Sequence, residues 1–133
     1  MENINSKQSD QEFYDDLCFI RLRDDGILEI NITADKEYDK NNILRIMANI
    51  KRVIRCNRHK MLIICSEDAN LSYEALTIIN TPFSSDYAIT KAYVLKSISQ
   101  RIMIGVFLRL IKSTFPTGLF KNLQDAEQWL NVQ

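Results

Sequence analysis

The sequence contains little of what a catalytic or metal-binding site needs. It has a single histidine, His59, so no second histidine is present to share a metal ion with it. Its three cysteines, Cys18, Cys56 and Cys65, are odd in number, and no two of them have the C-x-x-C spacing of metal or redox sites. We therefore expect no structural metal, no disulfide and three free thiols, as is usual in a reducing compartment.

Long hydrophobic runs are lacking too. The longest apolar-rich run, Ile102–Leu108, has seven residues, whereas a helix needs about 20 to cross a bilayer. The N-terminal sequence MENINSKQSDQEF has neither the basic start nor the apolar stretch of a secretory signal peptide. We expect a cytoplasmic protein with no integral membrane association.

The chain has no net charge, because 17 basic residues balance 17 acidic ones. A general nucleic-acid binder needs a cationic field to neutralise phosphates, so we expect no nucleic-acid partner. The charges are nevertheless segregated along the chain. Residues 1–39 hold eleven acids and four bases, and residues 40–133 hold six acids and thirteen bases. The two parts are therefore expected to attract each other in the folded protein.

Glycine-rich phosphate loops and catalytic constellations are absent as well, and the chain has only three glycines. Glu67 and Asp68 are neighbouring carboxylates that follow a predicted strand, which is where α/β proteins bind ligands. Paired acids without a histidine, a nucleophile or a second metal ligand fall short of a catalytic or metal site, so a solvated loop is the favoured interpretation. We expect neither an enzyme nor a cofactor.

The residues that are present alternate between strand and helix patterns. An Asp-Gly turn at 25–26 joins two apolar segments into a hairpin, and the unbroken run Met61–Cys65 is typical of a strand buried on both faces. The residues after Asp39 have the one-sided apolar spacing of a helix. The expected strands are Leu17–Leu22, Ile27–Ile32, Met61–Cys65, Ala92–Leu95 and Gly118–Phe120, and the expected helices are 40–57, Leu71–Asn80, 98–112 and Leu123–Val132.

This β-β-α-β-α-β-α-β-α order predicts an α/β fold with one mixed sheet. The opening hairpin is antiparallel, and the later right-handed crossovers add parallel strands under amphipathic helices. Met61–Cys65 and Ala92–Leu95 are expected to be central. A chain of 133 residues is long enough for one domain with its own core. We place this domain at residues 10–133, after a disordered polar tail at residues 1–9.

The helix expected at 98–112 carries two candidate sites. Ser97 and Gln100 have the spacing of a capping box, and a helix N-terminus can also hold an anion, so either capping or an anion or ligand site is open. The helix is also more apolar than one core contact needs. A core-facing set is assigned to Ile102, Met103, Val106, Phe107, Leu110 and Ile111.

That assignment leaves Ile104 and Leu108 beside the basic residues Arg101 and Arg109. Either a neighbouring element covers the two aliphatic side chains, or they are exposed and form a contact patch. We take these four residues as the candidate interface, for a protein partner or for a second copy of the chain in a homodimer.

The last third of the chain resembles the SpoIIAA-like families. The resemblance lies in a characteristic order of residues and elements. A strand is followed by Lys-Ser, a helix that contains Arg, a Pro, a strand that ends in Phe, and a helix with Ala and Trp-Leu. The matching residues are Lys96, Ser97, Arg101, Pro116, Phe120, Ala126, Trp129 and Leu130. These families are STAS-type domains, related in fold to anti-sigma-factor antagonists and to CRAL-TRIO lipid carriers. The resemblance extends over Leu17 to Leu130 and implies a four- or five-stranded mixed sheet.

The resemblance also implies a type of function. Anti-sigma-factor antagonists carry a phosphorylatable serine in an Asp-Ser-Ser-Gly turn after the central strand. Ser66 and Ser72 lie in the matching region without that motif, and they are the candidate phosphorylation sites. The chain is thus expected to be a non-enzymatic regulatory or protein-interaction module, like small bacterial members of this type. The alternative is a carrier or sensor of a small apolar or lipid-like ligand.

Overall fold

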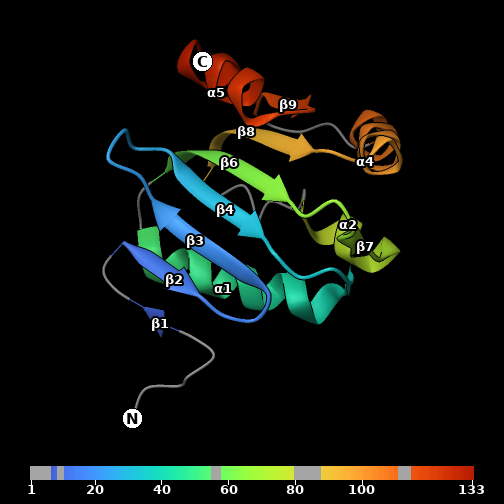
Figure 1. Ribbon diagram of the computed structural model, residues 1–133, viewed down its shortest axis with the longest axis horizontal. Coiled ribbons are helices and arrows are strands. Elements are labelled where there is room, and N and C mark those ends of the chain that lie inside the picture. The colour runs from blue at the N-terminus through green and yellow to red at the C-terminus, as the bar shows by residue number, and fades with distance from the viewer. Residues whose placement is uncertain (1–6, 9–10, 55–57, 80–87, 111–114) are drawn as a thin grey trace.

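A seven-stranded sheet forms the centre of the protein, as the computed structural model shows (Figure 1). The structure describes residues 7–8, 11–54, 58–79, 88–110 and 115–133. The strands lie in the order β1-β2-β3-β4-β6-β8-β9. Their bounds are β1 Lys7–Gln8, β2 Glu12–Tyr14, β3 Cys18–Leu22, β4 Leu28–Ile32, β6 His59–Cys65, β8 Ala88–Leu95 and β9 Thr117–Phe120.

The sheet is mixed, as the sequence predicts. The pairs β1–β2, β2–β3 and β3–β4 are antiparallel, and the pairs β4–β6, β6–β8 and β8–β9 are parallel. The turn between β3 and β4 contains Gly26 with a φ of 86°, the positive value that its Asp-Gly sequence favours. Strand β6 lies between β4 and β8 and buries Met61, Leu62 and Ile63. Its predicted central position is confirmed.

Two features of the strands differ from expectation. The sheet has two more strands than the upper number that the resemblance implies, because β1 and β2 extend its antiparallel edge. Strand β1 lies within the expected tail, whose other residues are outside the described part. A second, two-stranded sheet joins β5, Glu37–Tyr38, to β7, Asn70–Leu71. The sequence of residues 33–38 is mostly polar, yet Tyr38 is fully buried and donates a hydrogen bond to the Leu17 carbonyl.

Four helices are described: α1 Lys40–Ile54, α2 Tyr73–Ile79, α4 Ile98–Leu110 and α5 Leu123–Asn131. Side-chain oxygens cap all four by accepting from a backbone N–H three residues on, with Ser97 at α4 the longest at 3.5 Å. The other distances are 2.9 Å for Asp39 at α1, 3.1 Å for Ser72 at α2 and 2.9 Å for Asn122 at α5. The expected ends of α1 at 57 and α4 at 112 lie outside the described residues. No described helix is long and apolar enough to cross a membrane.

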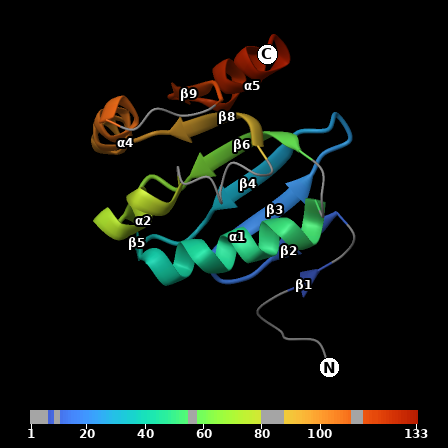
Figure 2. The same cartoon turned by 180° about the vertical axis from the view of Figure 1, so that it is seen from behind.

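The helices divide between the two faces of the sheet (Figures 1 and 2). Helix α1 lies across one face, and with α2 and α4 it buries the larger core. Helix α5 covers the other face, where Ala126 and Leu130 pack on Leu62, Ala92 and Val94. The six apolar positions of α1 that give it a one-sided pattern are all buried: Ile43, Ile46, Met47, Ile50, Val53 and Ile54. A strand at the sheet's centre thus has apolar neighbours on both faces.

Contacts between the acidic and basic parts of the chain occur at α1. The Arg45 guanidinium lies 2.7 Å from a carboxylate oxygen of Asp16 and 3.3 Å from one of Asp15. Arg45 belongs to the basic part of the sequence and the two aspartates to the acidic part. The expected attraction therefore holds β2 and β3 to the helix that covers them.

Candidate functional site

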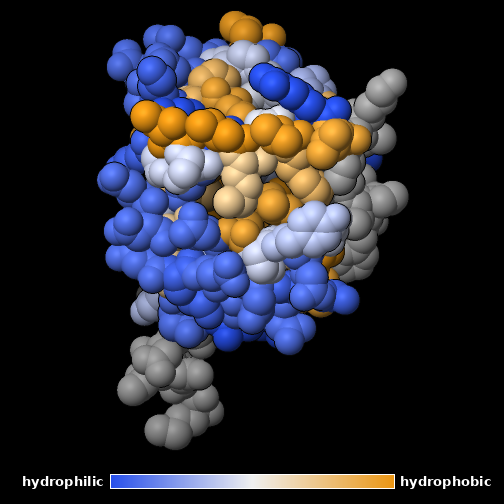
Figure 3. Space-filling view, turned by 90° about the vertical axis from the view of Figure 1, so that its right-hand side faces the viewer, coloured by the Kyte–Doolittle hydropathy of each residue, from blue (hydrophilic) through white to orange (hydrophobic). Residues whose placement is uncertain are grey.

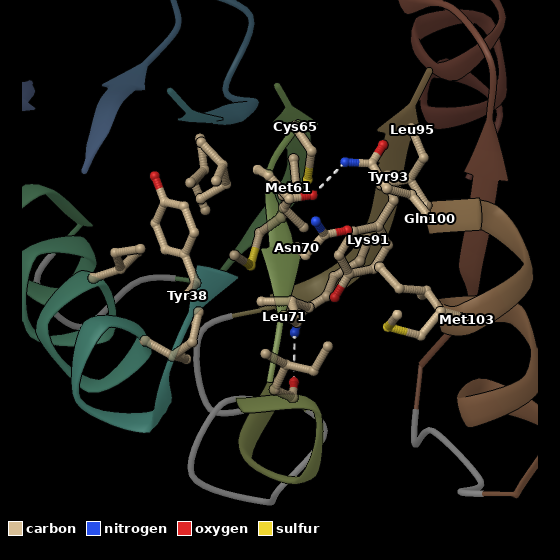
Figure 4. A pocket seen from close by; sticks show the side chains of 18 of the residues that line it. Tyr38, Met61, Cys65, Asn70, Leu71, Lys91, Tyr93, Leu95, Gln100 and Met103 are labelled. Atoms are coloured by element: carbon tan, nitrogen blue, oxygen red, sulfur yellow. Dashed lines mark hydrogen bonds between the residues drawn. The ribbon is translucent and has the colours of Figure 1, made fainter. Parts of the chain in front are cut away.

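A cavity of about 100 Å³ lies between the sheet and helices α1, α2 and α4 (Figure 4). Its lining includes the last residue of each of three parallel strands, Ile32 of β4, Cys65 of β6 and Leu95 of β8. The carboxyl ends of parallel strands are where α/β proteins bind ligands. The topology therefore places an apolar pocket at the end of the sheet that is best suited to a binding site.

The pocket opens to solvent between β7 and α4. Two of its lining residues, Asn70 and Met103, are exposed, and Leu71 is half-buried. Figure 3 shows a hollow with a hydrophobic floor beneath a hydrophobic band on this side of the molecule. A small molecule can therefore reach the lining without unfolding of the sheet.

Lys91 is the one charged residue in the lining that the structure describes. It lies on β8 with 4% of its surface exposed, and its amine donates a 3.0 Å hydrogen bond to the Ile79 carbonyl at the end of α2 (Figure 4). The amine also lies 5.4 Å from the centre of the Phe115 ring. No carboxylate among the described residues is within ion-pair distance of it. Loss of hydration on burial lowers the pKa of Lys91 to about 8.

Gln100 joins the start of α4 to the loop after β6. Its side-chain NH₂ donates to the Ser66 carbonyl at 2.8 Å and to the Ala69 carbonyl, and its side-chain oxygen accepts from the Ser97 N–H at 3.3 Å. The Gln100 N–H in turn donates to the Ser97 hydroxyl at 3.5 Å. The capping box that the sequence predicts is therefore present. An anion or ligand role for Ser97 and Gln100 stays a prediction, and the Gln100 amide is occupied by the chain itself.

The thiols of the described cysteines are poor nucleophiles. Burial raises the pKa of Cys65, in the pocket, to about 12, and burial with the nearby Asp15 does the same for Cys18 in the core. Both cysteines are free, and Cys56 lies outside the described residues. A thiol needs to ionise before it can attack a substrate. Within the described ranges, no three His, Cys, Asp or Glu side chains are grouped closely enough to hold a metal ion.

The outer and inner faces of α4 are the reverse of those expected. Ile104 is only 4% exposed, and Leu108 is half-buried against the larger core, so of the two alternatives for these side chains the structure has the covered one. Of the residues assigned to the core, Phe107 is buried and Ile111 lies outside the described part. The other four are exposed: Ile102, Met103, Val106 and Leu110.

The exposed aliphatic side chains of α4 form a row that we call the α4 stripe. Its members recur every four residues, and they are Ile98 (68% exposed), Ile102 (61%), Val106 (49%) and Leu110 (78%). Figure 3 shows the hydrophobic band along this face. A shallow groove borders the stripe and is also lined by Arg101, Gly105 and Arg109. Arg109 is exposed, whereas Arg101 is half-buried and donates to the Leu95 carbonyl.

The two candidate phosphorylation sites each make a local contact. The Ser66 hydroxyl donates to the Asp35 carboxylate, and the Ser72 hydroxyl caps α2. Both serines are half-buried, so neither is a freely exposed acceptor, and their modification stays a prediction. Glu67 and Asp68 are exposed in the loop between β6 and β7, in agreement with the solvated interpretation.

Comparisons with known proteins agree with the topology. A family model described as a domain of unknown function, DUF7793, matches residues 20–132. A crystal structure of an uncharacterized protein from the DUF3478 family of Shewanella loihica PV-4, described as having a SpoIIAA-like fold, is 14% identical in sequence. It superposes with a TM-score of 0.53 over 98% of each chain. No curated protein matches. The predicted SpoIIAA-like fold is confirmed, and no finding links the chain to CRAL-TRIO proteins.

Proposed function

The chain belongs to the DUF7793 family and has a SpoIIAA-like fold, and from this premise we propose that it is a non-enzymatic regulatory module that binds another protein. The observation that carries the proposal is the α4 stripe. Its four aliphatic side chains are exposed along one line of a single helix, over about 18 Å at ~1.5 Å per residue. Contiguous exposed apolar surface with a charged rim is typical of protein contact sites.

The partner we propose is a second copy of the same chain. The stripe is symmetric about its midpoint, with Ile102 and Val106 at the centre and Ile98 and Leu110 at the ends. When two such helices pack antiparallel, Ile98 meets Leu110 of the other copy and Ile102 meets Val106. Two-fold dimers need this kind of self-complementary patch. The contact area of one helix face is small, so the dimer is of the weak, transient class.

Sedimentation equilibrium tests the proposal directly. We expect the wild-type chain to form a dimer whose fraction rises with concentration, and the double variant Ile102→Glu, Val106→Glu to be a folded monomer, because charges at an interface centre are strongly unfavourable. Val132→Glu, at an exposed valine beyond α5 (79% against 49% for Val106), is the control and should dimerise like the wild type. Far-UV circular dichroism checks that all three fold.

Two outcomes contradict the proposal. A wild-type chain that stays monomeric at its highest soluble concentration excludes self-association, and a dimer that survives the double substitution places the contact elsewhere. A third arm adds vesicles of anionic lipid. Binding of monomeric wild type to them, lost in the double variant, would replace a protein contact by a membrane surface as the role of the stripe.

A second candidate function is favoured by the pocket at the strand ends, namely the binding of a small apolar ligand by a carrier or sensor. An engineered apolar cavity of about 150 Å³ binds benzene. A cavity of about 100 Å³ therefore suits a molecule of a few heavy atoms and is too small for a whole lipid chain. Native mass spectrometry of the protein purified without detergent tests this. A ligand mass that is lost on denaturation would support the function, and a clean protein mass at every preparation would count against it.

For either function, we propose that the protein acts in the cytoplasm and does not bind nucleic acid. The free thiols of Cys18 and Cys65 fit a reducing compartment, and the balanced charge of the chain gives no cationic field for phosphates.

A further inference from the structure

The pocket combines an apolar lining with a buried ammonium group that has no carboxylate partner among the described residues. A buried charge is unfavourable unless it is paired or fully hydrogen-bonded. An ammonium has three N–H donors, and one of those of Lys91 is used by the Ile79 carbonyl. As far as the described residues go, the Lys91 amine therefore keeps donors that a bound molecule can use.

Two of the other polar side chains that line the pocket, Gln100 and Tyr38, are already hydrogen-bonded to the chain. The Gln100 amide bonds the loop carbonyls of Ser66 and Ala69, and the Tyr38 hydroxyl donates to Leu17. Asn70 is at the exposed mouth. Recognition of a polar ligand group within the pocket therefore falls to Lys91.

From this arrangement we infer that the pocket binds a small monocarboxylate with a short apolar tail, whose carboxylate accepts hydrogen bonds from the Lys91 ammonium. The inference rests on the second candidate function, ligand binding, and names its ligand class. One cation matches one negative charge, and a doubly charged phosphate would leave charge unpaired in an apolar site. A volume of about 100 Å³ allows a tail of roughly four carbon atoms, by comparison with benzene in a larger cavity.

A purely structural role for Lys91 is the competing explanation. Its bond to Ile79 also satisfies a carbonyl at the last described turn of α2, where cations are favourable. The two explanations make different predictions. A helix-capping lysine affects stability alone, whereas a ligand-binding lysine distinguishes an acid from an uncharged molecule of the same shape.

The test is a titration followed by NMR of isoleucine methyl groups, because isoleucines line much of the pocket. The probes are 3-methylbutanoate and the uncharged alcohol 3-methylbutan-1-ol, which has the same carbon skeleton, with acetate and octanoate as size controls. We expect saturable shifts of pocket methyls such as Ile30, Ile63 and Ile104. The branched acid should bind about tenfold tighter than the alcohol, which is the effect of one charge-assisted hydrogen bond.

Two lysine variants separate the roles. Lys91→Met should bind the acid no better than the alcohol. Lys60→Met is the matched control, because Lys60 is also partly buried and donates to a backbone carbonyl, that of Leu130, at 2.8 Å but lies outside the pocket. It should keep the preference of the wild type for the acid.

A measurement on the wild type covers the case in which Lys91→Met fails to fold. The Lys91 side-chain signals are titrated with and without 3-methylbutanoate, and a bound carboxylate must raise the pKa of Lys91. The other titratable groups in the pocket are Tyr38, Cys65 and Tyr93, and no other charged side chain lines it among the described residues. Asp86→Asn is titrated in parallel, because Asp86 is the acid closest to Lys91 in the sequence.

The outcomes are distinguishable. Equal binding of acid and alcohol in the pocket overturns the inference and leaves ligand binding standing, whereas no shift of pocket methyls by any probe counts against both. A Lys91 pKa that falls in Asp86→Asn and is unmoved by the acid means that the chain supplies its own counter-charge, and this also overturns the inference.

Discussion

Lys91 shows how one residue can set the chemistry of this site. The strand that contains it begins and ends with apolar residues, and Lys91, Tyr93 and Leu95 alternate onto the pocket face. The sequence predicts a strand from Ala92, whereas β8 begins four residues earlier at Ala88 and includes Lys91. Burial of Lys91 could not be predicted from residue type. Its signal in the sequence was the period of two that it shares with the next two pocket residues.

The lowered pKa of Lys91 predicts a rise of stability with pH. The unfolded chain binds the proton with a pKa near 10.5 and the folded chain with one of about 8, so between these values unfolding takes up a proton and the folded state gains stability as pH rises. The thiols of Cys18 and Cys65 act oppositely above pH 9, because burial raises their pKa to about 12. Both thiols are present in the wild type and in Lys91→Met, so their contribution to the pH dependence cancels when the stabilities of the two proteins are compared.

The quantity to compare is the difference in unfolding free energy between the wild type and Lys91→Met. We expect this difference to increase by about 1 kcal/mol, in favour of the wild type, from pH 7 to pH 9. Urea unfolding of both proteins at each pH measures it, without added carboxylate. A difference that stays flat over this range would mean that the amine is paired or hydrated in the folded protein.

Helices α1 and α4 show what a pattern can determine at the scale of an element. Helix α1 has a mostly polar outer side, so the six apolar residues of its buried side were predicted correctly, although the buried Asn49 was not. Helix α4 has aliphatic residues around its whole circumference. Its hydrophobic periodicity therefore does not indicate which side of the helix faces the core. The residue that marks its inner side is the polar Gln100, which is buried with Ile104 and Phe107 at the spacing i, i+4, i+7. From the sequence alone, a glutamine is expected to be exposed. Its burial is explained only by its hydrogen bonds to loop carbonyls, which become visible in the folded structure.

Single truncations on α4 test this orientation. Ile104→Ala should lower the unfolding free energy by about 2–4 kcal/mol, because it leaves a cavity in the larger core. Ile102→Ala removes the same atoms from an exposed site, and we expect a change within about 0.5 kcal/mol. Denaturant unfolding at low protein concentration, where self-association contributes little, compares the two. Equal losses would contradict the assigned inner face.

At the scale of the whole molecule, the order of elements was sufficient to predict the main topology. An Asp-Gly hairpin followed by strand–helix units with right-handed crossovers leaves few arrangements, and the observed order β3-β4-β6-β8-β9 is one of them. The antiparallel edge could not be predicted in the same way. Strands β1 and β2 are two and three residues long and mostly polar, so they have no period to detect. The pocket, too, depends on elements far apart in the sequence and appears only when these are packed.

The N-terminal edge leads to a prediction about the boundary of the domain. Phe13 of β2 is 6% exposed within the larger core, and the Asp15 carboxylate accepts hydrogen bonds from the Leu17 and Cys18 N–H groups. Strand β1 adds only two residue pairs at the outermost edge. A chain that starts at residue 10 should therefore lose no more than about 1 kcal/mol of stability, since a few exposed edge hydrogen bonds contribute little.

A chain that starts at residue 15 should behave differently. It lacks Phe13, whose loss from the core alone is worth about 3–5 kcal/mol, and it leaves β3 as an unpaired edge open to association. Urea unfolding with light scattering compares both truncations with the full chain. We expect near-native unfolding for the first and marked destabilisation with aggregation for the second. If the first truncation is as unstable as the second, the domain begins before residue 10, because the first nine residues must then contribute to its folding.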